Sequence, residues 1–403
     1  MGDYVGLYME AEKAELYRKK GKKNYLRKDS LKIKEVKEGI ILPAKEDKKK
    51  EKLWCIGGVV DKLGEFVEES ITENVNLFGG IYDFDEKNII ASNETVVFMG
   101  PFLSHWGHFI CDQISRLWYV LDNPKKYKIA YCGWNWGSEN TDVWGNYLEF
   151  FELLGIPKEN LINVKKPTKY KEVIIPEISF YMNKYYTIEF KNIFKKIVSN
   201  VKLEQNIEKY DLIFYSRGKF DFAKGRERGE KTFEKIFEKN GYKIIEPELL
   251  TLSQQIYYLQ NCKKMVATSG SITHNLLFAQ KEIEVTILNK MYLMNNYQMV
   301  IDNMSNAKIT CVDVYANIFP VCFGLGPFYM RLNKNFYKFC RKNSIRLSTL
   351  DKFNIFSDIS NFIWYINKYF SIYSNADNMA ILKSQIKSRK ALKIREQEEF
   401  GGK

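Results

Sequence analysis

The chain has 403 residues, of which 45% are hydrophobic and 15% aromatic, and this composition excludes an intrinsically disordered protein. The length accommodates two domains, each with its own hydrophobic core. The formal net charge of +13 favours anionic partners, which include nucleotide phosphates, nucleic acid and acidic membrane surfaces. Charge alone does not choose among these partners.

Cysteine spacing and hydropathy restrict the class of protein further. The seven cysteines form no C-x-x-C pair, which argues against a disulfide framework and against a zinc ribbon. The amino terminus soon becomes lysine-rich and carries no signal-peptide pattern. The best apolar run, Ile318–Met330, is too short to span a bilayer and contains two prolines. We therefore expect a cytoplasmic protein.

The first half of the chain predicts one α/β domain over residues 1–210. Short alternating segments from about residue 25 to residue 93, broken by glycine and charge, predict strands and turns. The elements expected after them are a histidine-bearing helix from about residue 104, a strand at 128–131, a helix at 144–154, a strand at 172–176 and a long helix at 186–206.

The second half predicts a separate domain over residues 211–330. Four apolar segments predict strands, at 212–217, 242–245, 264–267 and 284–288. Helical segments separate them, at 230–240, 253–261 and 272–279. Strands that alternate with helices in this way indicate a parallel, doubly wound sheet. Ligands of such sheets bind at the carboxyl ends of the strands.

The tail, residues 331–403, is rich in aromatic and basic residues. It has two interpretations. Its helices could pack back on the first domain, as most amphipathic helices cover a core. Alternatively, the aromatic and basic composition could give peripheral contact with the inner face of the cell membrane. We favour the first interpretation.

Two of the three histidines lie in one short segment. Wound as a helix, His105, His108, Asp112 and Arg116 share one face, since offsets of three, four and seven residues return to the same side. One interpretation is proton transfer, with Asp112 or a histidine as base and the arginine keeping the carboxylate ionised. A metal site and a polar seam between domains are the alternatives. We favour catalysis.

A second polar cluster follows the strand predicted at 264–267. Ser269, Gly270 and Ser271 precede the next helix, whose unpaired N–H groups and positive dipole end can bind phosphate. Arg217 lies at the carboxyl end of another strand and points towards the same place. A guanidinium there can neutralise a diphosphate leaving group without a metal.

These segments, in their order and spacing, resemble the family 61 glycosyltransferases from roughly Trp54 to Leu288. The segments that carry the resemblance are Gly107-His108-Phe109 with Asp112 and Arg116-Leu117-Trp118, Tyr215-Ser216-Arg217, Arg226 with Glu230, Glu246-Pro247-Glu248, Leu252-Ser253 with Gln255-Ile256, and Ser269-Gly270-Ser271 with Asn275-Leu276-Leu277-Phe278.

The resemblance implies a GT-B-like α/β fold, in which two Rossmann-like domains face a cleft and the second holds the donor. It implies a hexosyl- or pentosyltransferase that inverts the anomeric carbon without a metal or other cofactor. The donor is a nucleotide sugar, taken as UDP-linked, and the acceptor is a glycan or lipid-linked glycan in bacterial capsular or other surface polysaccharide biosynthesis. No nucleic-acid partner is implied.

Mapped onto this sequence, the resemblance gives three groups of site residues. The catalytic candidates are Asp112, His108 and His105, and Arg116 lies on the acceptor side. The donor-binding candidates are Arg217, Arg226, Glu248, Ser269, Gly270, Ser271 and Asn275.

The chain departs from the family pattern at three places. Ser269 stands where many members have histidine. The family's Arg-x-x-Asn-Glu becomes Arg226-Glu227-Arg228-Gly229-Glu230. Leu288-Asn289 replaces an acidic residue that often follows the late strand, a position linked to ribose recognition.

Two functions of other classes compete with sugar transfer. One is a metal hydrolase that uses His105, His108 and Asp112. The other is a non-enzymatic protein that binds anionic partners through its positive charge. Asp83 and Asp85 also form a D-x-D pair of the kind that holds a divalent metal in some sugar transferases, although aspartates in such a glycine-rich region often serve turns.

Overall fold

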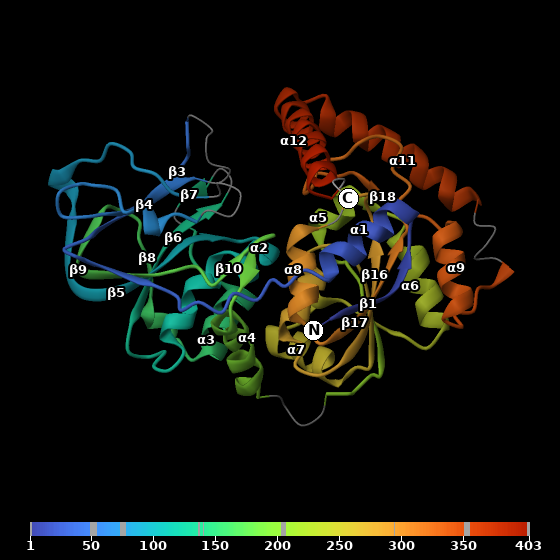
Figure 1. Ribbon diagram of the computed structural model, residues 1–403, viewed down its shortest axis with the longest axis horizontal. Coiled ribbons are helices and arrows are strands. Elements are labelled where there is room, and N and C mark those ends of the chain that lie inside the picture. The colour runs from blue at the N-terminus through green and yellow to red at the C-terminus, as the bar shows by residue number, and fades with distance from the viewer. Residues whose placement is uncertain are drawn as a thin grey trace.

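The structure is a computed structural model that describes residues 2–48, 55–72, 78–135, 138–139, 141–202, 207–293, 295–349 and 355–400. It is an α/β protein with two main sheets, which lie in two lobes side by side (Figure 1). The expected α/β class is therefore confirmed. One sheet is mixed and the other is entirely parallel.

The first sheet is built around the long strand β5. Its strands are β4 (Ile56–Val60), β3 (Ile40–Lys45), β9 (Thr168–Pro176), β5 (Ile90–Leu103), β6 (Lys128–Asn135) and β7 (Ser138–Glu139), in that order, with β2 (Ile33–Lys37) on β9 and β8 (Leu161–Asn163) on β6. The last eight residues of β5 are all buried. Such a continuous apolar strand requires cover on both faces. The helices of this lobe are α2 (Trp106–Cys111), the 3₁₀ helix η3 (Gln113–Val120), α3 (Gly145–Leu154) and α4 (Ile188–Asn200).

The second sheet has six parallel strands. In spatial order they are β14 (Lys243–Ile245), β12 (Leu212–Tyr215), β15 (Lys264–Thr268), β16 (Ile283–Asn289), β17 (Ala307–Asp313) and β1 (Asp3–Tyr8). The main helices of this lobe are α6 (Glu230–Lys239), α7 (Leu252–Asn261), η6 (Ser271–Phe278), α8 (Asn296–Met304) and α9 (Lys334–Lys342). The parallel sheet predicted for residues 211–330 is thus present.

Strand order identifies where this sheet can bind a ligand. Numbered along the chain from β12, the strands lie in the order 2-1-3-4-5. The order reverses between β12 and β15, and open α/β sheets bind ligands outside the carboxyl ends of the strands at such a switch point. Arg217 follows β12 and Gly270 follows β15. Both predicted donor-binding elements therefore lie at the switch point.

The amino-terminal strand corrects the predicted division of the chain. The sequence predicts one domain over residues 1–210, but β1 pairs with β17 and extends the second sheet. Helix α1 (Ala11–Gly21) follows it, and Lys13 of α1 forms a buried ion pair of 2.7 Å with Asp313 at the end of β17. A strand that covers the edge of a parallel sheet removes an unpaired edge, which explains this crossing between domains.

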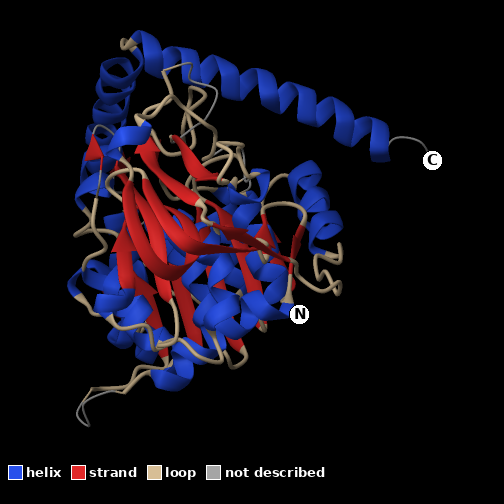
Figure 2. Ribbon diagram, turned by 90° about the vertical axis from the view of Figure 1, so that its left-hand side faces the viewer, coloured by secondary structure: helices blue, strands red, loops and turns tan. Residues whose placement is uncertain are grey.

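The tail also differs from expectation. Helices α11 (Ile355–Tyr373) and α12 (Ala376–Phe400) pack on the second lobe and not on the first (Figures 1 and 2). The inner face of α11 buries Tyr369 and Tyr373 against Cys322 and Phe328. The physical reason is local, because segment 314–330 leaves the second sheet with apolar side chains that need cover. No helix in the described part of the chain is long and apolar enough to cross a bilayer.

The two lobes share an apolar contact. Phe278 of η6 packs against Phe150 of α3 and Phe194 of α4, with ring centroids 6.4 and 5.1 Å apart. Glu149 of α3 reaches across to α7 and accepts hydrogen bonds from the N–H groups of Leu252 (2.7 Å) and Ser253 (2.9 Å). A carboxylate at a helix N-terminus satisfies donors that have no partner within the helix. The lobes are therefore held in a fixed relation beside the candidate site.

Candidate functional site

Helix α2 starts directly beyond the carboxyl end of β5. His105 is its N-cap residue, with an extended backbone, and its Nδ1 accepts a hydrogen bond of 3.5 Å from the His108 N–H. The Gln113 side chain makes two hydrogen bonds with the main chain of Leu103, at 3.0 and 3.1 Å. These contacts fix the turn between strand and helix, and so the place of both histidines.

The sequence predicts one long helix with His105, His108, Asp112 and Arg116 on one face, but the α-helix ends before Asp112. From there the chain continues as the 3₁₀ helix η3, which turns by about 120° per residue where an α-helix turns by about 100°. Arg116 is rotated away from the histidines as a result, and it is buried. Its guanidinium donates hydrogen bonds to the carbonyl oxygens of Glu69, Ile71, Met99 and Pro176. These contacts contradict an acceptor-side role for Arg116.

Asp112 and His108 form a hydrogen-bonded pair one turn apart. Asp112 Oδ2 lies 2.8 Å from His108 Nδ1 and accepts a second bond of 2.9 Å from the Tyr297 hydroxyl. The Asp112 side chain is 0% exposed, whereas that of His108 is 24% exposed. With Nδ1 donating to the carboxylate, Nε2 is the ring nitrogen that can accept a proton. Asp112 is thus placed to orient His108 and is too deeply buried to meet a substrate.

All three histidines of the chain lie around this point. The rings of His105 and His108 are 4.7 Å apart, and Tyr297 lies 5.7 Å from His108 and 6.1 Å from His274. His274 belongs to η6 in the second lobe. Burial, and then the neighbouring His108 and His105, lower the pKa of His274 to about 3. His274 is therefore neutral at physiological pH and adds no charge to the site.

The glycine of α2 brings the two lobes into direct contact. A Cβ atom on Gly107 would lie 2.8 Å from Ser271 Oγ and 3.1 Å from His274 Nδ1, both in the second lobe. Trp106 Nε1 donates a hydrogen bond of 2.7 Å to Asn275 Oδ1 across the same contact. The structure thus places the histidine helix and the serine-rich turn against each other.

This close approach gives a prediction for stability. Gly107→Ala should lower the free energy of unfolding by about 1–3 kcal/mol, because the added methyl group overpacks the contact between the lobes. Gly225→Ala is the matched control, since a Cβ there has no heavy atom within 4 Å and the residue lies in helix α5 (Asp221–Arg226). Urea titration measures both. Equal midpoints for Gly107→Ala and the wild type would contradict so close an approach of the two lobes.

Two cations lie beside the Gly270 turn. A Cβ on Gly270 would be 3.3 Å from Arg217 Nη1 and 3.5 Å from Lys290 Nζ, and the φ of +151° at this residue suits glycine. Glu227 joins the two cations: its Oε1 lies 3.0 Å from Arg217 Nη2 and 2.7 Å from Lys290 Nζ. All three side chains are buried. The turn therefore faces two positive charges that share one carboxylate.

The ionisation of this cluster follows from burial and mutual contact. Burial alone would raise the pKa of Glu227, but Arg217 and Lys290 lower it to about 2. Burial, and then the charge of Arg217, lower the pKa of Lys290 to about 8. Burial and the adjacent Glu227 raise the pKa of Glu230 to about 7. At neutral pH Glu227 is thus ionised, and its charge is shared by Arg217 and Lys290.

Glu230 connects the two strand ends of the switch point. Its carboxylate accepts hydrogen bonds from the Arg217 N–H at 3.0 Å and from Thr268 Oγ1 at 2.8 Å. Because these donors lie at the ends of β12 and β15, Glu230 fixes the spacing between the two strand ends. Its role is to position Arg217 and the turn.

The other predicted donor-binding residues divide into two groups. Glu248 follows β14, and its charge is among those that raise the pKa of Arg217, after Glu227 and Glu230, against the effect of burial. Ser269 Oγ accepts a hydrogen bond of 3.2 Å from the Lys290 N–H and so shapes the turn. These residues lie with the cluster.

Arg226 and Asn275 lie elsewhere. The Arg226 guanidinium donates to the carbonyl oxygens of Gly324 and Leu325, 3.3 and 3.1 Å away, and so holds the loop before β18 (Phe328–Tyr329). Asn275 is buried between Trp106 and Gln255. Its Oδ1 accepts a hydrogen bond from Trp106, and its Nδ2 donates one of 3.2 Å to Gln255 Oε1. These contacts support the loop and the contact between the lobes, and donor binding by Arg226 and Asn275 stays a prediction.

Metal ligands are not assembled here. Within the described ranges, no group of three or more His, Cys, Asp or Glu side chains is arranged to hold a metal ion. Asp85 of the D-x-D pair caps a short 3₁₀ turn by accepting from the Lys87 N–H at 2.9 Å. The metal-site interpretation of His105, His108 and Asp112 therefore lacks a ligand set.

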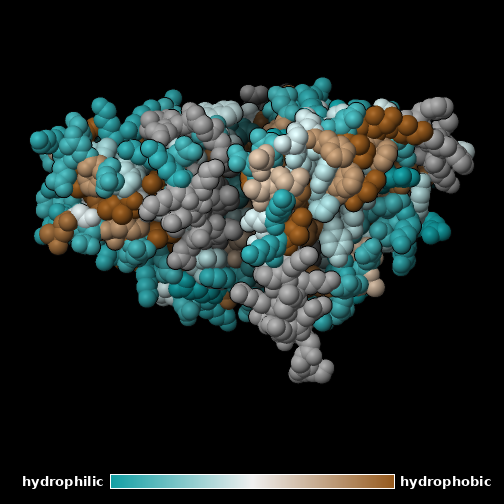
Figure 3. All heavy atoms as spheres, turned by 90° about the horizontal axis from the view of Figure 1, so that it is seen from above, coloured by the Kyte–Doolittle hydropathy of each residue, from teal (hydrophilic) through white to brown (hydrophobic). Residues whose placement is uncertain are grey.

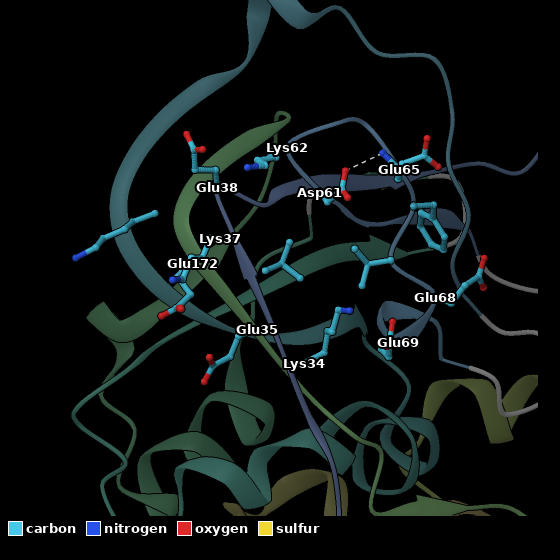
Figure 4. A pocket seen from close by; sticks show the side chains of 14 residues that line it. Lys34, Glu35, Lys37, Glu38, Asp61, Lys62, Glu65, Glu68, Glu69 and Glu172 are labelled. Carbon is cyan, nitrogen blue, oxygen red and sulfur yellow. Dashed lines mark hydrogen bonds between the residues drawn. The ribbon is translucent and has the colours of Figure 1, made fainter.

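A cavity on the first lobe lies apart from this site. It measures about 1100 Å³ and occupies the surface beside β2, β4 and β9 (Figure 4). Lysine and carboxylate side chains line it together, among them Lys34, Lys62, Glu68 and Glu172. None of the predicted site residues contributes to it. We do not assign it to the chemistry.

Three contributors to the site escaped the sequence-based prediction. Lys290 could have been found, since it follows β16 as Arg217 follows β12. Glu227 lies inside the Arg226–Glu230 segment of the family pattern, which gives it no role. No sequence pattern marks Tyr297 as a site residue, because only the packing of α8 against the first lobe brings its hydroxyl to Asp112.

Comparison with known proteins gives one positive result. Residues 106–286 match the model of the family described as Glycosyltransferase 61. The matched segment starts at α2, ends within β16 and covers less than half of the chain; of the site residues described above, His105, Lys290 and Tyr297 lie outside it. No curated protein matches the chain. The family match supports glycosyltransferase activity in general, with a nucleotide-sugar donor and a glycan acceptor.

Proposed function

We propose that this protein is an inverting, metal-independent glycosyltransferase with a GT-B-like arrangement of its two lobes. The observation that carries the proposal is the contact of Gly107 with Ser271. It brings a histidine–carboxylate pair from one lobe to the phosphate-binding type of turn in the other. A base and a cationic site for the leaving group are the two groups that this reaction requires.

His108 acts as the general base in this proposal. Asp112 holds the Nδ1–H of His108, as the carboxylate of a catalytic triad holds its histidine, so that Nε2 receives the proton. The acceptor oxygen loses that proton and forms a bond to the anomeric carbon. The bond from this carbon to the diphosphate oxygen breaks at the same time, on the opposite face of the sugar, and the configuration inverts.

Arg217 and Lys290 stabilise the departing diphosphate. Charge develops on the leaving oxygen as the bond breaks, and preorganised cations in a water-poor site stabilise it more than water does. The N–H groups at the start of η6 and the Ser271 hydroxyl add neutral donors at the same turn. A nucleoside diphosphate can thus leave without a divalent metal.

The nucleoside extends over the neighbouring strand ends. Glu248, after β14, is available to accept hydrogen bonds from ribose hydroxyls. Phe220 is exposed and lies over the Arg217 guanidinium, 5.1 Å from it, where its ring can stack on a base. We take the donor as UDP-linked and the product as a bacterial surface polysaccharide made at the inner face of the membrane.

A panel of nucleotide sugars tests the proposal. A true donor at about 100 times its dissociation constant should stabilise the protein by roughly 3 kcal/mol. Thermal unfolding with UDP-, GDP-, ADP- and CMP-linked sugars measures this shift, and release of free sugar or nucleotide reports turnover. A protein that no member of the panel stabilises is not a sugar-nucleotide enzyme of this type.

Donor binding should weaken as the pH rises through about 8. Lys290 carries its charge below that pKa and loses it above, so the attraction for a diphosphate is complete at pH 7 and falls in more alkaline solution. Calorimetric titration with the donor's nucleoside diphosphate between pH 6.5 and 9.5 follows the change. A dissociation constant that stays level across that range would show that Lys290 does not serve the diphosphate.

Removal of metal separates transfer from the hydrolase alternative. Transfer should continue at an unchanged rate in EDTA, because two protein cations stabilise the leaving group. The assay compares initial rates before and after chelation, and after addition of zinc, magnesium or manganese. Activity that disappears with EDTA and returns with zinc would favour the hydrolase.

A further inference from the structure

Helix α11 has two faces with different surroundings. Its inner face is fixed to the second lobe: the Tyr373 hydroxyl accepts from the Cys322 N–H at 2.8 Å and donates to the Gly326 carbonyl at 2.6 Å, and the Tyr365 hydroxyl accepts from the Phe319 N–H at 3.0 Å. These bonds define the rotation of the helix. The orientation of its exposed sides is therefore fixed as well.

An apolar stripe runs along one exposed flank of α11. Its members are Ile359, Ile363 and Phe370, which are 51%, 54% and 60% exposed. Spacings of four and seven residues put these side chains on one side of the helix. Apolar side chains gather on the face of the molecule that carries the C-terminal helices (Figure 3). A contiguous apolar stripe rimmed by polar residues marks an interaction surface.

Cationic segments flank this stripe in the sequence, and one of them contacts α11 in the structure. The segments Arg331–Arg346 and Lys383–Arg395 each contain six lysines or arginines and no acidic residue. Arg331 lies 3.8 Å from Asp358 of α11, so the first segment adjoins the start of that helix. Lys383 and Lys387 of α12 are exposed. An apolar stripe flanked by cations matches the interface of an anionic bilayer, where acyl chains lie under negative headgroups.

We propose that α11 docks this protein on an anionic lipid bilayer, with its apolar stripe in the interface and the flanking cations on the headgroups. Charge favours a bilayer over a second copy of the chain. A twofold interface through α11 would oppose each cationic segment with cationic segments of the other copy. Because the docked face binds lipid and not a sugar nucleotide, this inference does not depend on the proposed activity.

The docking helix α11 lies close to the candidate functional site. Phe328 packs under α11 with Tyr369 and Tyr373, and its ring lies 4.8 Å from Lys290 Nζ. Helix α11 and Phe328 therefore lie between a bilayer bound at the stripe and Lys290. In combination with the proposed activity, this placement favours an acceptor carried on a lipid.

Vesicle sedimentation of the full chain tests the proposal. Wild-type protein should pellet with vesicles of equal parts phosphatidylglycerol and phosphatidylcholine, and should pellet little with phosphatidylcholine alone. Ile363→Ser combined with Phe370→Ser should lower the partition coefficient at least tenfold. Lys383→Glu combined with Lys387→Glu should lower it by about fivefold or more per charge. Added salt should weaken binding of the wild type.

The matched control is Leu63→Ser combined with Ile90→Ser, which removes two exposed apolar side chains from the first lobe. Its binding should equal that of the wild type, and unfolding curves establish that all variants fold. Three results would overturn the proposal: equal binding to neutral vesicles, wild-type binding by the α11 variant, or a wild-type dimer in lipid-free sedimentation that the α11 substitutions convert to a monomer. Vesicle binding by a protein that binds no nucleotide sugar would refute the proposed function alone.

Discussion

His108→Ala should lower the rate of sugar transfer by about 10²–10⁴-fold and leave the fold and donor binding unchanged. The imidazole is partly exposed and receives its orientation from a buried carboxylate 2.8 Å away. Of the other two histidines, His274 is buried and His105 uses Nδ1 to cap α2. Single-turnover assays with saturating donor measure the chemical step directly.

Two companion variants define which residue is the base. Asp112→Asn should cause a large loss as well, because a neutral amide does not stabilise the imidazolium that forms when His108 takes the proton. His105→Asn should retain most activity, since asparagine still caps α2. Loss in His105→Asn together with near-normal turnover in His108→Ala would move the role of base to His105.

Lys290→Met should weaken binding of the donor's nucleoside diphosphate by about 10–100-fold, the effect of losing one buried charge-assisted contact. Methionine keeps an unbranched side chain of similar length against Phe328, and Arg217 continues to pair with Glu227. The variant should also lose the weakening of binding above pH 8. Calorimetry at pH 7 and pH 9 measures both effects.

Lys290→Arg is the control for charge. A guanidinium keeps the positive charge, so binding at pH 7 should stay within a few-fold of the wild type, and the decline near pH 8 should disappear because arginine does not titrate there. If Lys290→Met binds as tightly as the wild type, Arg217 alone serves the diphosphate and the role given to Lys290 is wrong.

The parallel sheet could be predicted because its signals are local. After residue 211 the sequence shows four apolar strands separated by three helices, and polar residues or glycine mark the strand ends. Strand order could not be predicted, since it depends on pairing between distant segments. It is the order β14-β12-β15 that brings Arg217 beside Gly270.

The errors have one common cause, which is tertiary contact. The stripe through Arg116 assumes an α-helix, but buried carbonyl oxygens bind the guanidinium and the segment winds as a 3₁₀ helix. Strand β1 joins the second sheet because the open edge of β17 accepts it. The C-terminal helices cover segment 314–330, whose apolar side chains the sequence did not identify as a docking site.

The pairing of His108 with Asp112 follows from the helical period, and the structure retains it over the one turn where the helix is regular. Tyr297 and Lys290 could not be paired with these residues from spacing, because 185 positions separate Tyr297 from Asp112. For a site formed between two lobes, the sequence therefore predicts the motif of each lobe. It does not predict which residues of the two lobes come into contact.

The central claim is that a base from the first lobe and a cation site from the second form one active site. The most direct test titrates nucleoside diphosphates into the wild type, His108→Ala and Lys290→Met and then assays transfer by each protein. The wild type and His108→Ala should bind the same nucleotide with equal affinity, and only the wild type should transfer sugar at full rate. Lys290→Met should bind at least tenfold more weakly. A wild type that binds no nucleoside diphosphate, or a His108→Ala enzyme with undiminished turnover, would contradict this account.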